Sequence, residues 1–197
     1  VANHLNKTIF HISIITLILN FGCKRDLKKS WEYDNQKTTE LIMQILKDES
    51  NNYLSSSCIT EKPRTIFYPM VMNFDKHVKK YLKIKDTIHY KKQKHFYKKF
   101  KITSKLVPNK NILTQKQFEE LEKKSKNKEL RFWDWLDTYC NNGYSSISKP
   151  IFNENYDLAY VQIGKICGES CGAGEERIYT FVNGKWIKKE NISSWIS

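Results

Sequence analysis

The strongest constraint on the fold lies in residues 177–187. After Arg177, the β-branched residues Ile178, Thr180 and Val182 alternate with the aromatic residues Tyr179 and Phe181, and this period of two places the two sets on opposite faces of a strand. Asn183-Gly184 follows, a dipeptide that tolerates the positive φ angles of a type I′ turn. Trp186 and Ile187 then open a returning strand. Together with the strand formers at residues 158–163, this pattern predicts an antiparallel β-meander over residues 147–197.

The part of the chain before the meander has helical periodicity. Apolar residues recur every three or four positions in short segments separated by polar breaks. The expected helices cover residues 38–49, 73–84, 89–101, 115–124 and 132–139. Asn73 and Thr114 are the expected N-caps, and Thr114 has the spacing of a capping box with Gln117. Helices followed by strands predict the α+β class, with a helical region over residues 38–140 packed on a small C-terminal antiparallel sheet.

The size and composition fit a single domain. The chain has 197 residues, of which 40% are hydrophobic and 13% aromatic. This content is enough to bury a core, so wholesale disorder is excluded. Residues 23–37 are polar and basic and are expected to form a tether. Residues 38–197 are expected to form one α+β domain.

Residues 1–22 have the organisation of a secretory signal peptide, with a short basic start and an apolar stretch from Ile9 to Phe21. Thirteen helical residues span only about 20 Å, less than the roughly 30 Å of a bilayer core, so a stable transmembrane helix is not expected. The ending Gly22-Cys23 resembles a bacterial lipoprotein signal. The resemblance implies that Cys23 is acylated and holds the chain at a membrane surface. The alternative is an ordinary cleaved signal with an incidental cysteine.

The four remaining cysteines are compatible with two disulfides in a non-reducing compartment. Cys167 and Cys171 are close enough in sequence to bridge a turn, and this pairing would leave Cys58 with Cys140. Other pairings and free buried thiols remain alternatives, because geometry can forbid a bond that the sequence allows.

Residues 76–101 carry most of the positive charge. The chain has 34 Lys and Arg residues against 21 Asp and Glu residues, and this segment contains eleven lysines and a single acid, Asp86. Interleaved lysines and aromatic residues can bind a polyanion. The candidate binding residues are Lys91, Lys92, Lys94, Lys98 and Lys99. The lack of arginine and the predicted export argue against nucleic acid, so an anionic envelope glycan or lipid is the expected partner. A simple solvated helix face is the alternative.

Residues 164–176 contain four of the seven glycines together with Cys167 and Cys171. They are expected to form a compact hairpin loop pinned by the two cysteines. The stretch Gly168–Gly172 also matches the Gly-x-Ser-x-Gly nucleophile elbow, but that motif needs a following helix and a later histidine. The match is therefore interpreted as accidental. No histidine follows His95, so no metal site is predicted there, and no cofactor is expected.

Several C-terminal segments carry a resemblance to known proteins. They are Ser148–Asn153, Leu158–Val161, Cys167-Gly168-x-x-Cys171-Gly172-x-Gly174, Asn183–Trp186 and the terminal Trp195-Ile196-Ser197. This set resembles a family of uncharacterised Bacteroidota lipoproteins over about residues 130–197. The resemblance implies a cell-envelope location and a glycine-cysteine hairpin above a small sheet, and it brings no activity.

The sequence therefore predicts an exported, lipid-anchored protein of the cell envelope, an outer-membrane lipoprotein that acts as a non-catalytic binding or structural module. The competing class is a thiol-dependent or hydrolytic enzyme. Such an enzyme needs a cleft where a cysteine or carboxylate meets His77, His89 or His95. We expect no histidine nitrogen within hydrogen-bond reach of a cysteine sulfur.

Overall fold

The computed structural model describes residues 30–48, 52–63, 73–127, 131–140 and 142–197. The chain divides into two compact units, Val1–Lys37 and Thr38–Ser197. In the first unit residues 30–37 are helical, so this part of the predicted tether is an ordered helix. The predicted signal peptide and Cys23 lie outside the described residues.

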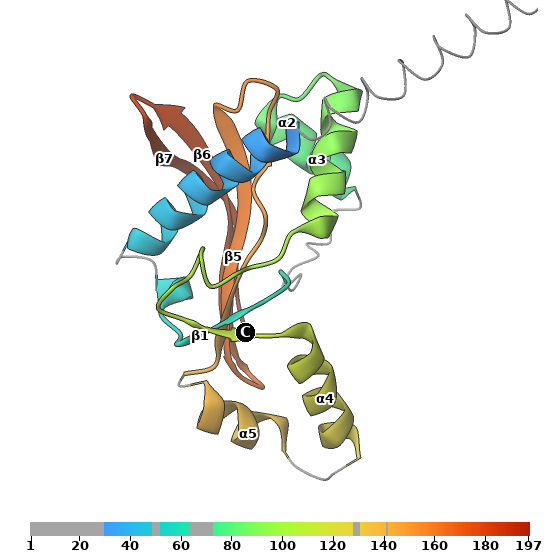
Figure 1. The fold of residues 1–197 in the computed structure, drawn as a ribbon, viewed down its shortest axis with the longest axis vertical. Helices are drawn as coiled ribbons and strands as arrows, with labels where there is room; N and C mark the ends of the chain where they lie inside the picture. Colours follow the sequence, from blue (N-terminus) through green and yellow to red (C-terminus); the bar gives the residue numbers. More distant parts are fainter. Residues whose placement is uncertain (1–29, 49–51, 64–72, 128–130, 141) are drawn as a thin grey trace, which may run out of the picture. The chain divides into compact units, whose positions relative to one another are not determined.

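The second unit is built on a seven-stranded mixed sheet with the order β2-β1-β3-β5-β6-β7, and β4 pairs with β5 off this path. The strands are β1 (Cys58–Thr60), β2 (Asn111–Leu113), β3 (Tyr144–Ile147), β4 (Ile151–Phe152), β5 (Leu158–Gly168), β6 (Cys171–Val182) and β7 (Lys185–Ile196) (Figure 1). β1 lies parallel to β2 and β3, while the other pairs are antiparallel.

The α+β class is confirmed, with two corrections. The antiparallel strands of the C-terminal part begin at Tyr144 rather than at residue 147, and the whole sheet is larger than the predicted meander. The sheet also includes β1 and β2, two three-residue strands from the region predicted to be helical. β1 pairs with β3, and β2 pairs with β1 at the edge of the sheet.

The helices follow the sequence pattern closely. They are α2 (Phe74–Leu82), α3 (Thr87–Lys99), α4 (Gln115–Lys126) and α5 (Phe132–Tyr139), with a short 3-10 helix η1 (Asn52–Leu54). The side chain of Asn73 caps α2, and Thr114 forms the predicted capping box with Gln117 at the start of α4. The helix expected to begin at residue 38 covers residues 30–47 of the described chain.

The hairpin between β6 and β7 is confirmed. Asn183 has a φ of 50° and Gly184 a φ of 76°, as a type I′ turn requires. Trp186 is paired with Phe181 across the two strands.

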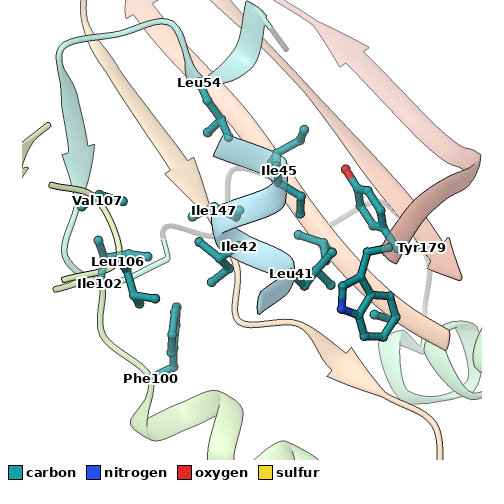
Figure 2. Close-up of a cluster of buried hydrophobic side chains, with 14 of the residues drawn as sticks. Leu41, Ile42, Ile45, Leu54, Phe100, Ile102, Leu106, Val107, Ile147 and Tyr179 are labelled. Carbon is teal, nitrogen blue, oxygen red and sulfur yellow. The ribbon is translucent and has the colours of Figure 1, made fainter. Parts of the chain in front are cut away.

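The two faces of the long strands bury different clusters. On one face, Leu41, Ile42 and Ile45 from the helical segment 38–47 pack against Ile147 and Tyr179 of the sheet (Figure 2). Because alternate strand residues point to opposite sides, the neighbours of Tyr179 face away from this cluster. Each fully buried aliphatic side chain of this kind contributes about 1.5–3 kcal/mol to stability.

The opposite face holds two clusters at different places along β5. Tyr160 and Ile178 pack against Val78, Leu82 and other residues of α2 and α3. Farther along β5, Ile166 packs with the cluster of α4 and α5. The lysine-rich helices are therefore supported by the central strands of the sheet.

Candidate binding surface

Helices α2 and α3 separate apolar from basic side chains. Val78 and Leu82 of α2, and Tyr90 and Phe96 of α3, are buried. At 3.6 residues per turn, the lysines fall on the outward arcs of both helices. The side chain of Asp86 caps α3 by accepting a hydrogen bond from the backbone N–H of Ile88 at 2.7 Å. The local sequence thus determines where α3 begins and places the lysines of both helices on the side facing away from the sheet.

The five candidate lysines all lie outside the buried arc of α3. Lys91, Lys98 and Lys99 are exposed, whereas Lys92 and Lys94 are half-buried. Four of them join no ion pair with the described residues, whereas Lys94 pairs with Asp75. The five lysines therefore share one side of α3, but they are not equivalent.

Lys94 joins α3 to α2 through Asp75. Its Nζ lies 2.8 Å from Oδ2 of Asp75, whose Oδ1 accepts a hydrogen bond from the Tyr90 hydroxyl at 3.1 Å. Burial raises the pKa of the Asp75 carboxyl, but hydrogen bonds from Lys94 and Tyr90 outweigh that effect and hold the pKa below its usual value. Asp75 is therefore ionised at neutral pH and its charge is balanced by Lys94.

Two lysines of α2 stand over tyrosine rings. Nζ of Lys79 lies 4.8 Å from the centre of the Tyr90 ring, and Nζ of Lys80 lies 5.6 Å from the centre of the Tyr81 ring. Both distances suit a cation–π interaction. These α2 lysines were not singled out from the sequence, although the spacing of residues 76, 79 and 80 opposite Val78 and Leu82 already indicates a shared face.

A buried polar network connects α2 to the sheet beneath it. Nε2 of His77 lies 3.0 Å from Oε2 of Glu176, and the amide of Gln162 donates to Oε1 of Glu176 at 3.1 Å and to the Tyr160 hydroxyl at 3.0 Å. Burial raises the pKa of Tyr160, and the neighbouring Glu176 carboxylate raises it further, so the phenol stays protonated. The sequence did not reveal the pairing of His77 with Glu176, because the two residues are far apart along the chain.

This network brings one carboxylate to a histidine, as the competing enzyme class requires. However, the Glu176 side chain is only 3% exposed and that of His77 14% exposed, so the pair lies beneath α2. His89 bonds instead to the backbone carbonyl of Phe152 at 2.9 Å. The arrangement fixes α2 on β5 and β6 and presents no exposed nucleophile.

The structure pairs the cysteines as Cys58–Cys140 and Cys167–Cys171, with Cα–Cα distances of 5.3 Å and 5.0 Å. The first bond joins β1 to the residue after α5. The second spans the turn between β5 and β6. With all four described cysteines in disulfides, none of them offers a thiol for catalysis.

The glycine-cysteine segment is a hairpin pinned by Cys167 and Cys171, as expected, but its strands extend almost to the tip and leave less loop than predicted. β5 continues to Gly168 and β6 starts at Cys171, which leaves a turn of two residues. The Gly-x-Ser-x-Gly match thus lies at a strand–turn–strand junction and lacks the helix that a nucleophile elbow needs. At Gly174, an added Cβ would lie 2.7 Å from the carbonyl oxygen of Ile163 and would meet the indole of Trp195. This glycine lets the indole cross the strand.

In the described ranges, no group of three His, Cys, Asp or Glu residues is arranged to hold a metal ion. Among the helices that the structure describes, none combines the length and apolar character needed to cross a membrane. Comparison with protein-family models, curated proteins and solved structures finds no match to this chain.

Proposed function

We propose that this chain is an exported cell-envelope protein, anchored through an acylated Cys23, that acts as a non-catalytic binding or structural module of the outer membrane. The observation that carries the proposal is the pair of disulfides, Cys58–Cys140 and Cys167–Cys171. Disulfides of this kind persist in non-reducing compartments and are rare where thiols are kept reduced. The resemblance to Bacteroidota lipoproteins supports the same location.

A binding role is favoured over catalysis by the chemistry of the described groups. The cysteines are oxidised, and the pairing of His77 with Glu176 is covered by α2. The accessible charged groups are instead lysines on the outward arcs of α2 and α3. These groups suit the electrostatic attraction of an anionic partner.

The intact mass of the protein extracted from membranes tests the anchoring and the compartment together. We expect a chain that begins at Cys23 and carries a diacylglyceryl group, and we expect reduction to add four hydrogens, two for each disulfide. An ordinary signal would give a shorter or unacylated chain in the soluble envelope fraction. Recovery of the unprocessed, reduced chain from the cytosol would overturn the proposal.

We infer a second function for the α2–α3 surface, the binding of an anionic envelope glycan or lipid. It is favoured by the common outward direction of Lys91, Lys98 and Lys99, with Lys92 beside them. Heparin serves as a polyanion probe. Retention should weaken steeply with salt, because each neutralised anionic group releases bound counterions.

Neutralising Lys91, Lys92, Lys94, Lys98 and Lys99 together should abolish this retention. Lys94 should contribute least among them, since its ammonium already pairs with Asp75. Unchanged retention of the fivefold variant would exclude the α3 lysines as the polyanion surface, without bearing on the acylation of Cys23.

A further inference from the structure

The outward face of α2 is hollowed into an open pocket whose lining residues are Asn73, Asp75, Lys76, Lys79, Lys80 and Ile84. Three of the six are lysines that occupy adjacent turns of one short helix.

The ammonium groups of this pocket are partly held in place. Lys79 and Lys80 rest over the rings of Tyr90 and Tyr81, and Tyr90 is itself fixed by its hydrogen bond to Asp75. A side chain that is already restrained loses less conformational entropy when it binds a ligand. The tyrosines thus organise the pocket before a ligand enters.

The pocket lining is positively charged, because it holds three lysines and one acidic residue. Asp75 is the acidic group in the lining, and it pairs with Lys94 of α3. The neighbouring Glu176 pairs with His77 on the inward side of α2. Lys76, Lys79 and Lys80 form no ion pair with the described residues, so their three ammonium groups remain to face an incoming anion.

We propose that this pocket is a binding site for one phosphate group, with Lys76, Lys79 and Lys80 as its ligands. This inference rests on the proposed anion-binding role of the α2–α3 surface, and it assigns that role to one pocket and one type of anion. A phosphate carries up to two charges and presents several acceptor oxygens, which suits three ammonium donors better than a singly charged carboxylate does. The phosphate belongs either to a lipid headgroup or to a phosphorylated glycan.

The direct test is a titration of the full chain with inorganic phosphate, in which changes in the amide NMR chemical shifts report binding. Replacing the three pocket lysines by glutamine should weaken phosphate binding at least about tenfold, whereas replacing them by arginine should retain it. The matched control is Lys123→Gln/Lys124→Gln/Lys126→Gln, which removes the same charge from exposed positions of α4, outside the α2–α3 surface, and should change binding less than about threefold.

A second measurement identifies the source of the phosphate. A Cys23→Ala full chain removes the anchor, and its sedimentation is measured with phosphatidylcholine vesicles that do or do not contain phosphatidic acid. Sedimentation that requires both phosphatidic acid and the pocket lysines assigns the site to a lipid headgroup. Binding of glucose 1-phosphate in solution, without sedimentation, assigns it to a phosphorylated glycan.

The outcomes separate this inference from the broader function. Equal loss of phosphate binding in the pocket and α4 variants would overturn the pocket, because it would show that binding follows total charge. Absence of any phosphate binding, with heparin retention intact, would overturn the pocket in the same way. Thermal unfolding of each variant checks that the outward substitutions leave the fold unchanged.

Discussion

At the scale of single residues, Glu61 shows how one carboxylate joins separate segments. Its Oε1 lies 2.8 Å from Nζ of Lys101, after α3, and its Oε2 accepts a hydrogen bond at 3.1 Å from the backbone N–H of Gln115, the first residue of α4. The hydrogen bond from Lys101, and then the one from Gln115, lower the pKa of Glu61 below its usual value. The ionised form of Glu61 is therefore the one that the fold stabilises.

This pKa direction predicts acid sensitivity. Because the unfolded chain takes up the proton at a higher pH than the folded chain, the stabilisation by Glu61 is complete above about pH 4.5 and is lost as the pH falls through the lower folded pKa. Glu61→Gln should lower the free energy of unfolding by about 0.5–1.5 kcal/mol at pH 7 and flatten its decline below pH 4.5. Urea unfolding across this pH range measures both effects. The exposed Glu120→Gln variant is the control, and equal behaviour of the two variants would contradict the assignment.

His77 gives a prediction about the buried network. Removing its imidazole leaves the buried Glu176 without one of its partners, so His77→Ala should lower the free energy of unfolding by about 1–3 kcal/mol. His95, exposed on α3, supplies the matched control, and His95→Ala should change stability by less than about 0.5 kcal/mol. Chemical denaturation of the two variants makes the comparison. Similar small losses would show that the contact with Glu176 contributes nothing.

Residue roles were predictable where they depend on near neighbours in sequence. The caps at Asn73 and Thr114 involve partners three positions away, so local spacing was sufficient. The pairing of His77 with Glu176 depends on how α2 lies across β6, and no local pattern contains that information. The same reason hid the contact of Lys79 with the Tyr90 ring, which lies on another helix. The charge of the candidate surface was thus predictable, but its pocket was not.

At the scale of elements, β7 forms one edge of the sheet and is protected in three ways. Its register with β6 shifts at two places, which marks bulges that interrupt a regular edge. Lys188 and Lys189 are exposed along it. Gln44 binds both backbone groups of Trp186: its side-chain oxygen accepts from the N–H at 3.0 Å, and its amide donates to the carbonyl. A side-chain amide thus occupies a position where another strand could pair.

Gln44→Ala should remove this protection. Loss of both hydrogen bonds should lower the free energy of unfolding by about 1–3 kcal/mol, and the uncovered edge should increase self-association. Lys47→Ala, on an exposed position of the same helix, is the matched control. Denaturation and sedimentation velocity give the two readouts. An unchanged Gln44→Ala variant would mean that the Trp186 backbone finds equivalent partners in water.

The elements themselves were predictable where the sequence carries a clear local period or turn signal. Periodic segments gave α2, α4 and α5, and the Asn183-Gly184 turn gave the hairpin of β6 and β7. β1 and β2 were missed because three residues are too few to show alternation, and parallel pairing depends on partners far away in sequence. The extent of β5 and β6 was underestimated because their glycines are typical of loops, yet here they accommodate Trp195.

At the scale of the whole molecule, the two disulfides should contribute unequally. Cys58–Cys140 has a sequence separation of 82 and Cys167–Cys171 a separation of 4. In the chain-entropy account, the longer loop should stabilise the fold by about 4–5 kcal/mol and the shorter one by about 2 kcal/mol. Cys58→Ser/Cys140→Ser should therefore unfold at a clearly lower urea concentration than Cys167→Ser/Cys171→Ser. The reverse order would contradict this account.

In the sequence, α2 and α3 lie between β1 and β2, and this order affects which positions of the protein tolerate substitution. β1 and β2 pair directly in the sheet, while the chain that connects them makes a long excursion carrying both lysine-rich helices. Only the inward half of that excursion is committed to the shared core. Its outward half can accumulate substitutions with little effect on strand register or cross-links. Substitutions there can consequently change the charge of this surface while the underlying frame stays the same.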